Sequence, residues 1–560
     1  MRHSANFCYR KFRQVLSILV CCALLAGCTS QTSRELASPI ESQLMAEIAL
    51  QRGEYLVAVQ EYLAMAARSD DAEFARRATE LAYEYGFLAH AVAGAERWVE
   101  LQPQDTSAHA YLGRLNVKRN LPVEAFRSLD LSLGPVAGRD DRDYYFLSSE
   151  LIELASPFRG LAVFELFNQA YPQNIAIVSS VASLANMVGE HELAIESARE
   201  ALLLAPESAI TRVWLARYLL AAGERSSAFE QMAFALEMSP GLDMGLEFVT
   251  LLVAAGEKED AQARMDRMFE RYPDEPLLNR QRGILAVEWQ DYPLAIQNFS
   301  ELLLSGWYVD ESFWYLGQVA YEQEDYLQAI RYFKRVGEGL WQSNAVNSIS
   351  RAYLEMGDVN TALTVQRDFL DRYPEKIVPQ AMVRAELLAS AEMLPEALET
   401  IDAALEFDPW NEWFWVYRGN LYDLMNDVEA ALGSYREAWK LAPEDPNMMN
   451  TLGYSLTVAG RDFDEAYQLI SGALERAPEN AAIMDSMGWI LFKQGDLSTA
   501  RTWLEQAYAK LPDPEVAAHL GEVMWEQGEK ESAREIWFKS LELNPDDRVL
   551  NDTIGRFTNE

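Results

Sequence analysis

Cysteine is scarce in this chain of 560 residues. Its four cysteines, Cys8, Cys21, Cys22 and Cys28, all lie within the first 28 residues. The rest of the chain therefore has no disulfide framework, no thiolate metal site and no thiol nucleophile. Any role for cysteine is confined to the amino-terminal segment.

Motifs that carry catalytic chemistry are missing as well. Beyond the first residues the chain has four histidines, His90, His109, His191 and His519, and none belongs to a His-Glu-x-x-His arrangement. There is no Gly-x-Ser-x-Gly nucleophile turn and no phosphate-binding Gly-x-x-x-x-Gly-Lys-Ser/Thr loop. We therefore predict that the protein is not an enzyme and that it uses no metal and no cofactor.

Basic residues are few relative to acidic ones. The chain has 48 Lys and Arg against 86 Asp and Glu, a formal net charge of −38. Such a charge repels phosphate backbones and anionic lipid surfaces, so we expect no nucleic-acid partner. Two interpretations of the acidity stay open: solvated helix faces that keep a long protein soluble, or a preference for basic partners.

Long apolar runs are absent after residue 28, where no segment approaches the roughly 20 apolar residues of a membrane-spanning helix. The apolar run before it, Val15 to Ala26, is too short to cross a bilayer as a permanent helix. Apolar residues nevertheless make up 49% of the chain and aromatic ones 11%, which excludes a disordered chain.

The amino terminus has the build of an export signal, because four basic residues precede the apolar run, which ends in Leu25-Ala26-Gly27-Cys28. This ending resembles the lipobox of bacterial lipoproteins, in which the chain is cut before the cysteine and the thiol carries diacylglycerol. The resemblance implies a signal peptide at 1–27, cleavage between Gly27 and Cys28, lipid on Cys28, and a lipidated tether at 28–38. The alternatives are an uncleaved anchor and an ordinary signal with a chance cysteine.

Thr29 follows the predicted lipidated cysteine. In the sorting rule of one lipoprotein family, a residue other than Asp at this position sends the protein onward to the outer membrane. We therefore expect the chain to be held on the cell outer membrane by its lipid, facing the periplasm.

Prolines recur at a nearly constant spacing. Pro172, Pro206, Pro240 and Pro273 are separated by 34, 34 and 33 residues, and a series of six from Pro374 to Pro545 continues at intervals of 33 to 35. A proline ends a helix because it lacks an amide donor and clashes with the preceding turn. Self-similarity at this period indicates a stacked helical array.

Other positions of each period agree with the prolines. Upstream of Pro512 the small and apolar positions are Gly488, Leu491, Gly495, Ala500, Leu504 and Ala507. The pattern resembles the tetratricopeptide repeat, whose scheme is Trp, Leu-Gly, Tyr, Ala, Phe, Ala, Pro over about 34 residues. The resemblance implies an all-α, right-handed superhelical solenoid of about fifteen helix-turn-helix repeats over 39–547, with a capping segment at 548–560. Small residues let the two helices of a repeat approach closely.

Two regions depart from the pattern. Residues 133–160 indicate a longer loop, and within 299–342 Trp307 and Trp341 replace the terminal proline of two consecutive repeats. The second departure has two interpretations, a locally repacked turn or a hinge between two halves of the array. Because each repeat packs only on its neighbours, we expect one continuous elongated core.

In tetratricopeptide repeats the first helix of each unit lines a concave groove, and the resemblance carries those positions onto this chain. The candidate groove residues are Trp314, Tyr321, Asn347, Arg351, Trp413, Asn420, Tyr454, Trp489 and Trp525. Aromatic rings interleaved with amides suit an extended peptide. The alternative is that several of these rings pack between adjacent repeats. The Lys/Asn/Arg set that grips a terminal carboxylate in chaperone–cochaperone repeats is absent from these positions.

The lipobox, the tether and the long array together resemble a family of outer-membrane tetratricopeptide lipoproteins of gram-negative bacteria. One member of that family is the adaptor of a periplasmic carboxyl-terminal processing protease, to which it presents cell-wall hydrolases. The resemblance implies a non-enzymatic adaptor that binds protein or peptide partners, among them a periplasmic serine protease and its substrates. The alternative is a structural assembly factor for envelope machinery, such as polysaccharide export, pilus or outer-membrane protein assembly.

Overall fold

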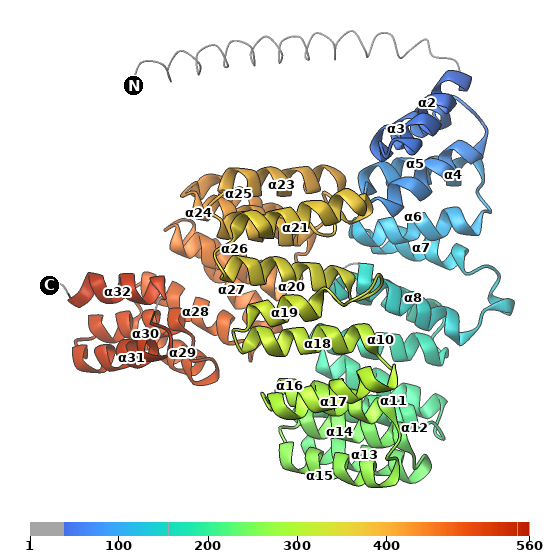
Figure 1. The fold of residues 1–560 in the computed structure, drawn as a ribbon. Helices are drawn as coiled ribbons and strands as arrows, with labels where there is room; N and C mark the ends of the chain where they lie inside the picture. The colour runs from blue at the N-terminus through green and yellow to red at the C-terminus, as the bar shows by residue number, and fades with distance from the viewer. Residues whose placement is uncertain (1–38, 155, 546, 559–560) are drawn as a thin grey trace, which may run out of the picture. The chain divides into compact units, whose positions relative to one another are not determined.

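The computed structural model describes residues 39–154, 156–545 and 547–558 (Figure 1). The predicted signal peptide, the tether and Cys28 lie outside these residues. Within the described residues every regular element is helical, in 31 α-helices, α2 to α32, and two 3-10 turns, η1 and η2. The prediction of an all-α fold is confirmed.

The chain divides into two compact units, residues 1–112 and 113–560, with the boundary inside helix α6 (Thr106–Lys118). The other described helices of the first unit are α2 (Pro39–Gln51), α3 (Tyr55–Ala66), α4 (Ala72–Glu84) and α5 (Leu88–Leu101). Its core contains the fully buried Trp98 of α5, whose ring lies 6.1 Å from that of Tyr111.

The second unit continues the same succession of short helices. They are α7 (Pro122–Ser132), α8 (Asp141–Leu154), α9 (Pro157–Ala170), α10 (Ile175–Met187), α11 (His191–Leu204), α12 (Ala209–Ala221), α13 (Arg225–Met238), α14 (Leu242–Ala254), α15 (Lys258–Arg271), α16 (Pro276–Glu288), α17 (Tyr292–Ser305), α18 (Val309–Glu322), α19 (Tyr326–Phe333), α20 (Gln342–Glu355), α21 (Val359–Arg372), α22 (Ala381–Ser390), α23 (Leu394–Phe407), α24 (Glu412–Leu424), α25 (Val428–Leu441), α26 (Pro446–Val458), α27 (Phe463–Arg476), α28 (Ala481–Lys493), α29 (Leu497–Lys510), α30 (Pro514–Glu526), α31 (Lys530–Leu543) and α32 (Arg548–Thr558).

Each even-numbered helix, here called a first helix, is followed by an odd-numbered second helix. This gives fifteen pairs, from α2–α3 to α30–α31, and the single helix α32. The predicted number of about fifteen repeats is confirmed.

Capping side chains explain where many helices begin. Asn411 Oδ1 accepts hydrogen bonds from the amides of Trp413 and Phe414, at 3.1 and 3.3 Å, and so satisfies donors that have no partner inside α24. Second helices such as α23 and α25 end two residues before the repeated proline, at Phe407 and Leu441.

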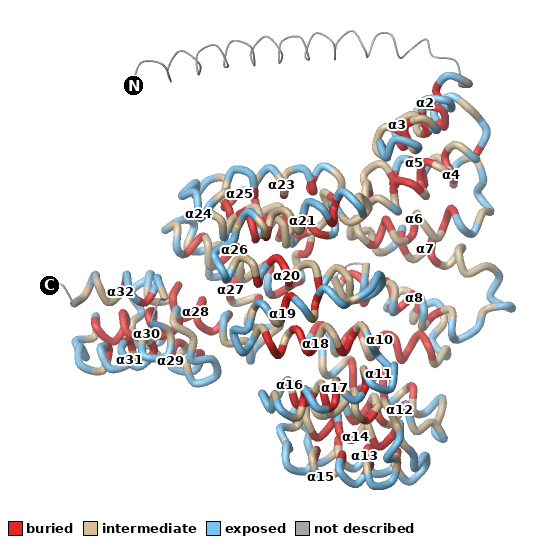
Figure 2. Tube along the Cα trace, viewed as in Figure 1, coloured by how far each residue is buried: buried red, intermediate tan, exposed pale blue. Residues whose placement is uncertain are grey.

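Small residues bring the two helices of a repeat close together. A Cβ atom at Gly419 of α24 would lie 2.3 Å from the ring of Tyr435 in α25, so glycine alone fits there. Ala431 and Ala438, on the facing helix, are each 1% exposed. Buried residues recur along the helices of both units, as expected for stacked repeats (Figure 2).

The irregularity predicted near 133–160 includes a longer connection between α7 and α8. It contains η1 (Val136–Gly138) and is held by Arg139, whose guanidinium donates to the main-chain oxygens of Asp130 and Gly134 at 2.7 and 2.8 Å.

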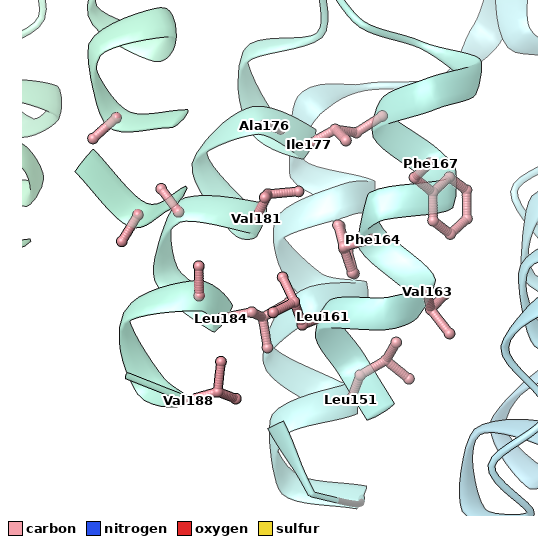
Figure 3. Close-up of a cluster of buried hydrophobic side chains, with 14 of the residues drawn as sticks. Leu151, Leu161, Val163, Phe164, Phe167, Ala176, Ile177, Val181, Leu184 and Val188 are labelled. Atoms are coloured by element: carbon pink, nitrogen blue, oxygen red, sulfur yellow. The ribbon is translucent and has the colours of Figure 1, made fainter. Parts of the chain in front are cut away.

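Helix α9 then packs on α7 and α10 more extensively than on its own partner α8. Phe164 and Phe167 of α9 are fully buried, in a cluster with Ile177 and Leu184 of α10 (Figure 3). The repeat is therefore present but its helices are rearranged.

At the second predicted irregularity, Trp341 takes the place of the proline and packs inward. Its ring lies 4.9 Å from that of Trp314, and the amide of Gly337 in the same turn donates to Asp310 Oδ1 at 2.8 Å. Trp307, by contrast, is 58% exposed. The structure shows a repacked turn at Trp341, and the division between the compact units lies elsewhere in the chain.

The second unit also contacts itself between repeats that are far apart in sequence. Arg159 of α9 is 4% exposed and donates to Glu412 Oε2 of α24 at 2.7 Å and to the main-chain oxygen of Lys118 at 2.7 Å. Lys118 Nζ lies 3.1 Å from Asp408 Oδ2. The amide of Asn120 donates to the main-chain oxygen of Leu441 at 3.2 Å. We call these six residues the closing contact.

Candidate protein-binding face

The inner side of the curved array in the second unit is formed by its first helices. In most consecutive repeats from α10 onward a first helix contacts the next first helix, whereas second helices from α9 onward have no comparable contact with their successors. Because successive first helices lie closer together than successive second helices, the array curves toward the first helices. The first helices therefore line its concave face.

A strip of polar and aromatic side chains follows this face from α18 to α24. Arg351 of α20 pairs with Glu386 of α22 at 2.9 Å, and both side chains are about half exposed. Burial raises the pKa of Tyr417 in α24 to about 12, and the Glu386 carboxylate adds to the effect. In α18, burial and then Glu355 raise the pKa of Tyr321 to about 12.

Trp413 and Asn420 of α24 lie at the end of this strip. The Trp413 side chain is 46% exposed. The exposed Asn420 accepts a hydrogen bond from the Tyr435 hydroxyl at 2.9 Å, and Asp423 accepts from the same hydroxyl at 2.6 Å. We call Tyr321, Arg351, Glu386, Tyr417, Trp413 and Asn420 the inner strip. An exposed ring beside an amide and charged groups can contact both the side chains and the backbone of a peptide.

Two other predicted groove residues serve the array itself. Trp314 is half-buried beside Trp341, and its indole nitrogen is buried with no hydrogen-bond partner. Asn347 Oδ1 accepts a hydrogen bond from Gln366 at 2.9 Å and so joins α20 to α21.

The predicted groove rings of the carboxyl-terminal repeats are covered. Trp489 is 7% exposed, and its ring stacks on His519 of the next first helix with centroids 3.8 Å apart. Trp525 is 9% exposed and stacks on Trp537 at 5.7 Å. Trp489 packs between two repeats and Trp525 packs within one repeat. Both rings therefore have the packing role that was the alternative to groove binding. The half-buried Tyr454 donates to Glu515 Oε1 at 2.5 Å.

Sequence reasoning missed a buried charged cluster on the same helices. Both carboxylate oxygens of Asp485 lie 3.0 Å from His519 Nδ1, and Glu522 pairs with Arg556 of α32. Asp485, His519 and Glu522 are each no more than 6% exposed. Each of the two pairs is 34 residues apart, one repeat period. Complementary polar residues at the same or adjacent positions of consecutive first helices are therefore the signal that could have found the cluster.

The stability of α28 and α30 should depend on pH through His519. Burial alone would lower the pKa of His519, but the carboxylates of Asp485, Glu515 and Glu522 outweigh burial, so the pKa lies above its usual value of 6.5. A raised folded-state pKa contributes stability that is fully present below the unfolded-state value and is lost as pH rises through the folded-state value. The protection of α28 and α30 in wild-type relative to His519→Gln should therefore be largest below pH 6.5 and decline as the pH rises above that value.

Amide hydrogen exchange of both proteins across this range measures the effect. Asp485→Asn should also reduce the pH dependence, because it removes the carboxylate that holds the proton. A ratio of wild-type to His519→Gln protection that is equal at every pH would contradict the assignment.

In the described part of the chain no group of three or more His, Cys, Asp or Glu side chains is arranged to hold a metal ion. Nor does any described helix combine the length and the apolarity needed to cross a membrane.

Family models of the tetratricopeptide repeat match residues 418–481 and 458–518. The matched segment runs from within α24 into α30. The chain thus has a tetratricopeptide-type helical solenoid fold, and repeats of this kind form protein-binding scaffolds that are generally not enzymes.

The relatives match over only part of their length. The chain is 31% identical to TPR repeat-containing protein PA4667 of Pseudomonas aeruginosa over 214 residues, 38% of this chain and 36% of that protein. It is 28% identical to human Tetratricopeptide repeat protein 7A over 174 residues, 30% of this chain and 20% of that one.

The chain is also similar to solved structures. A tetratricopeptide repeat protein from Parabacteroides merdae has a TM-score of 0.36 and 15% identity, covering 46% of this chain and 98% of that chain. The Cut9–Hcn1 hetero-tetramer of the APC/C has a TM-score of 0.34 and 14% identity, covering 94% of this chain and 97% of that chain.

Proposed function

We propose that this protein is a lipid-anchored periplasmic scaffold that binds protein partners through the inner strip of its second unit. The observation that carries the proposal is Trp413, which stays 46% exposed on the inner side while Trp489 and Trp525 are covered. An exposed tryptophan flanked by amide and charged groups has the composition of a protein-binding hot spot.

The proposed partner chemistry is an extended peptide or a protein loop. The rings of Trp413 and Tyr417 offer apolar surface, and Asn420 offers an amide for the backbone of a bound segment. The Arg351–Glu386 pair stands at the rim, where such a pair acts on partner choice and association rate more than on affinity.

The finer proposal is an adaptor that brings cell-wall hydrolases to a carboxyl-terminal processing protease on the outer membrane. Its support is the lipobox-like Leu25–Cys28 segment followed by a long array of repeats. An adaptor of this kind raises the effective concentration of protease and substrate on one membrane surface. The second candidate is an assembly factor for envelope machinery.

Affinity purification from detergent-solubilised envelopes separates the two candidates. Recovery of a serine protease together with cell-wall hydrolases supports the adaptor. Recovery of export, pilus or barrel-assembly components supports the assembly factor and removes the adaptor proposal.

Truncation of Trp413 should weaken partner capture strongly. A central interface tryptophan typically contributes about 2 kcal/mol or more, so Trp413→Ala should lower partner affinity by about 30-fold. The matched control is Phe538→Ala on α31, a second helix, where the ring is 48% exposed. Equal capture by Trp413→Ala and wild-type, with circular dichroism showing both folded, would remove the inner strip as the binding site.

Lipid attachment should depend on one residue. Cys28→Ser should lose incorporation of radioactive palmitate and accumulate as an uncut precursor, because lipidation precedes cleavage in proteins with this type of signal. A neighbouring variant, Thr29→Ser, should label as wild-type does. Continued palmitate labelling of Cys28→Ser would show that the lipobox assignment is incorrect.

A further inference from the structure

A pocket opens between the second helices α21 and α23, away from the inner strip. Its volume is about 670 Å³, a size typical of ligand-binding pockets, and α22 forms its floor. The pocket coincides with a local change in the repeat. After Pro374 the chain forms η2 (Pro374–Lys376) and further turns, and α22 begins only at Ala381. Pro379 lies two residues before the start of α22, and it has no amide hydrogen to donate.

The wall of this pocket is mostly apolar but contains an unsatisfied acceptor. Leu370, Val378 and Leu388 supply apolar surface. Gln366 also lines the pocket and is 1% exposed, and its side-chain oxygen has no hydrogen-bond partner. A buried acceptor without a partner costs about 1–3 kcal/mol, so a ligand that donates a hydrogen bond to Gln366 recovers that free energy.

A comparison of equivalent arginines identifies a second group that has no partner. Arg418 of α24 bridges successive second helices, because it donates to Asp402 of α23 at 2.7 Å and to Ser434 of α25 at 3.0 Å. Arg282 of α16 also bridges two second helices: it forms an ion pair with Asp266 of α15 at 3.7 Å and donates to Asn298 Oδ1 of α17 at 3.2 Å.

Arg384 of α22 stands at the equivalent position, 34 residues before Arg418. It lines the pocket, and among the described residues its half-buried side chain has no hydrogen bond or ion pair. Asp368, the counterpart of Asp402, is exposed and contacts Arg367 instead. The bridge formed by Arg282 and Arg418 in their repeats is therefore missing here.

We propose that this pocket binds the carboxyl-terminal end of an apolar peptide. The terminal carboxylate pairs with Arg384, a backbone amide near the terminus donates to Gln366, and the last apolar side chains occupy the space between α21 and α23. An arginine–carboxylate pair in a partly buried site is a strong, directional contact. A fatty acid would supply the carboxylate and the apolar body but no donor, so Gln366 would remain unsatisfied.

The test uses fluorescence polarisation with purified protein. The probe is a pool of fluorescein-labelled hexapeptides whose last three positions are restricted to Leu, Val, Phe and Ala, made as free acids and as carboxamides. We expect saturable binding of the free acids and at least tenfold weaker binding of the carboxamides. Arg384→Gln should reduce binding of the free acids at least tenfold. N-methylation of the last peptide bonds should weaken it several-fold, because it removes the donors to Gln366.

Two variants test the location. Ala403 is exposed and lines the pocket, so Ala403→Trp should block binding, whereas Ala509→Trp at an exposed position of α29 should leave it unchanged. Trp413→Ala should also leave it unchanged, which separates this site from the inner strip. Absence of binding, equal binding of acids and carboxamides, or displacement of the peptide by laurate would each overturn the proposal.

Discussion

Replacing Arg159 by methionine is expected to open the closing contact of the second unit. The Arg159 and Glu412 side chains are 3% and 6% exposed, so the substitution leaves a carboxylate buried without its counter-charge. Removal of one partner from a buried ion pair costs about 3–5 kcal/mol. Arg159 also donates to the main-chain oxygens of Lys118 and Trp410, and these acceptors lose their donor as well. Small-angle scattering should show a larger maximum dimension for Arg159→Met than for wild-type.

A cross-linking measurement reports the same contact directly. Glu190 and Glu444 are exposed and line one cavity of about 460 Å³ beside the closing contact. The experiment uses residues 29–560, which contain no cysteine of their own. With cysteines introduced at positions 190 and 444, a short bismaleimide should cross-link the two positions rapidly. Arg159→Met should slow this reaction at least tenfold. The double variant Arg159→Met with Glu412→Leu should recover most of the stability, because it removes the unpaired charge. Unchanged scattering and cross-linking in Arg159→Met would show that other contacts hold the unit closed.

Ending the chain at Pro545 should destabilise the last repeat. Helix α32 places Phe557 5.6 Å from both Trp525 and Trp537, and Leu550 of the same helix is fully buried. Full burial of one large apolar side chain is worth roughly 1.5–3 kcal/mol, and Phe557 is half-buried, so losing Leu550 and Phe557 should lower the free energy of opening α30 and α31 by about 2–4 kcal/mol. Removing Arg556 also leaves Glu522 without its partner.

Amide hydrogen exchange resolved by helix measures the effect of this truncation. Protection should fall in α30 and α31 and recover progressively toward α24, because the last repeats are stabilised mainly by their neighbours. Phe557→Ala should reproduce part of the loss, whereas Asp552→Ala, at an exposed position of α32, should have little effect. Unchanged protection of α30 and α31 after truncation would contradict the prediction.

The repeat architecture could be read from the sequence because it depends on contacts that are local and periodic. The prolines after second helices, and small residues such as Gly419 and Gly488, mark most stacking steps independently of the distant chain. The rearranged repeat of α8 and α9 was visible only as a break in the pattern. Its packing depends on which rings, such as Phe164 and Phe167, fill the space, and no periodicity encodes that choice.

The inner strip was predictable only in part. The repeat positions assign Trp413 and Asn420 to a first helix, α24, but position alone does not tell whether a ring is covered. Trp489 is covered because a histidine lies one repeat later, at His519. The pairing of Arg159 with Glu412 could not be predicted from the sequence, because the two residues are 253 positions apart and no local sequence pattern connects them.

The closing contact also constrains how this chain can evolve. Arrays of tandem repeats commonly gain and lose whole units, because a duplication or deletion leaves every remaining neighbour contact intact. Seven helix pairs, α10–α11 to α22–α23, lie between the two sides of the closing contact. Adding or deleting one of them would displace Glu412 from Arg159 by a full repeat. The number of units in this segment is therefore fixed by geometry, whereas the units after α25 remain free to vary.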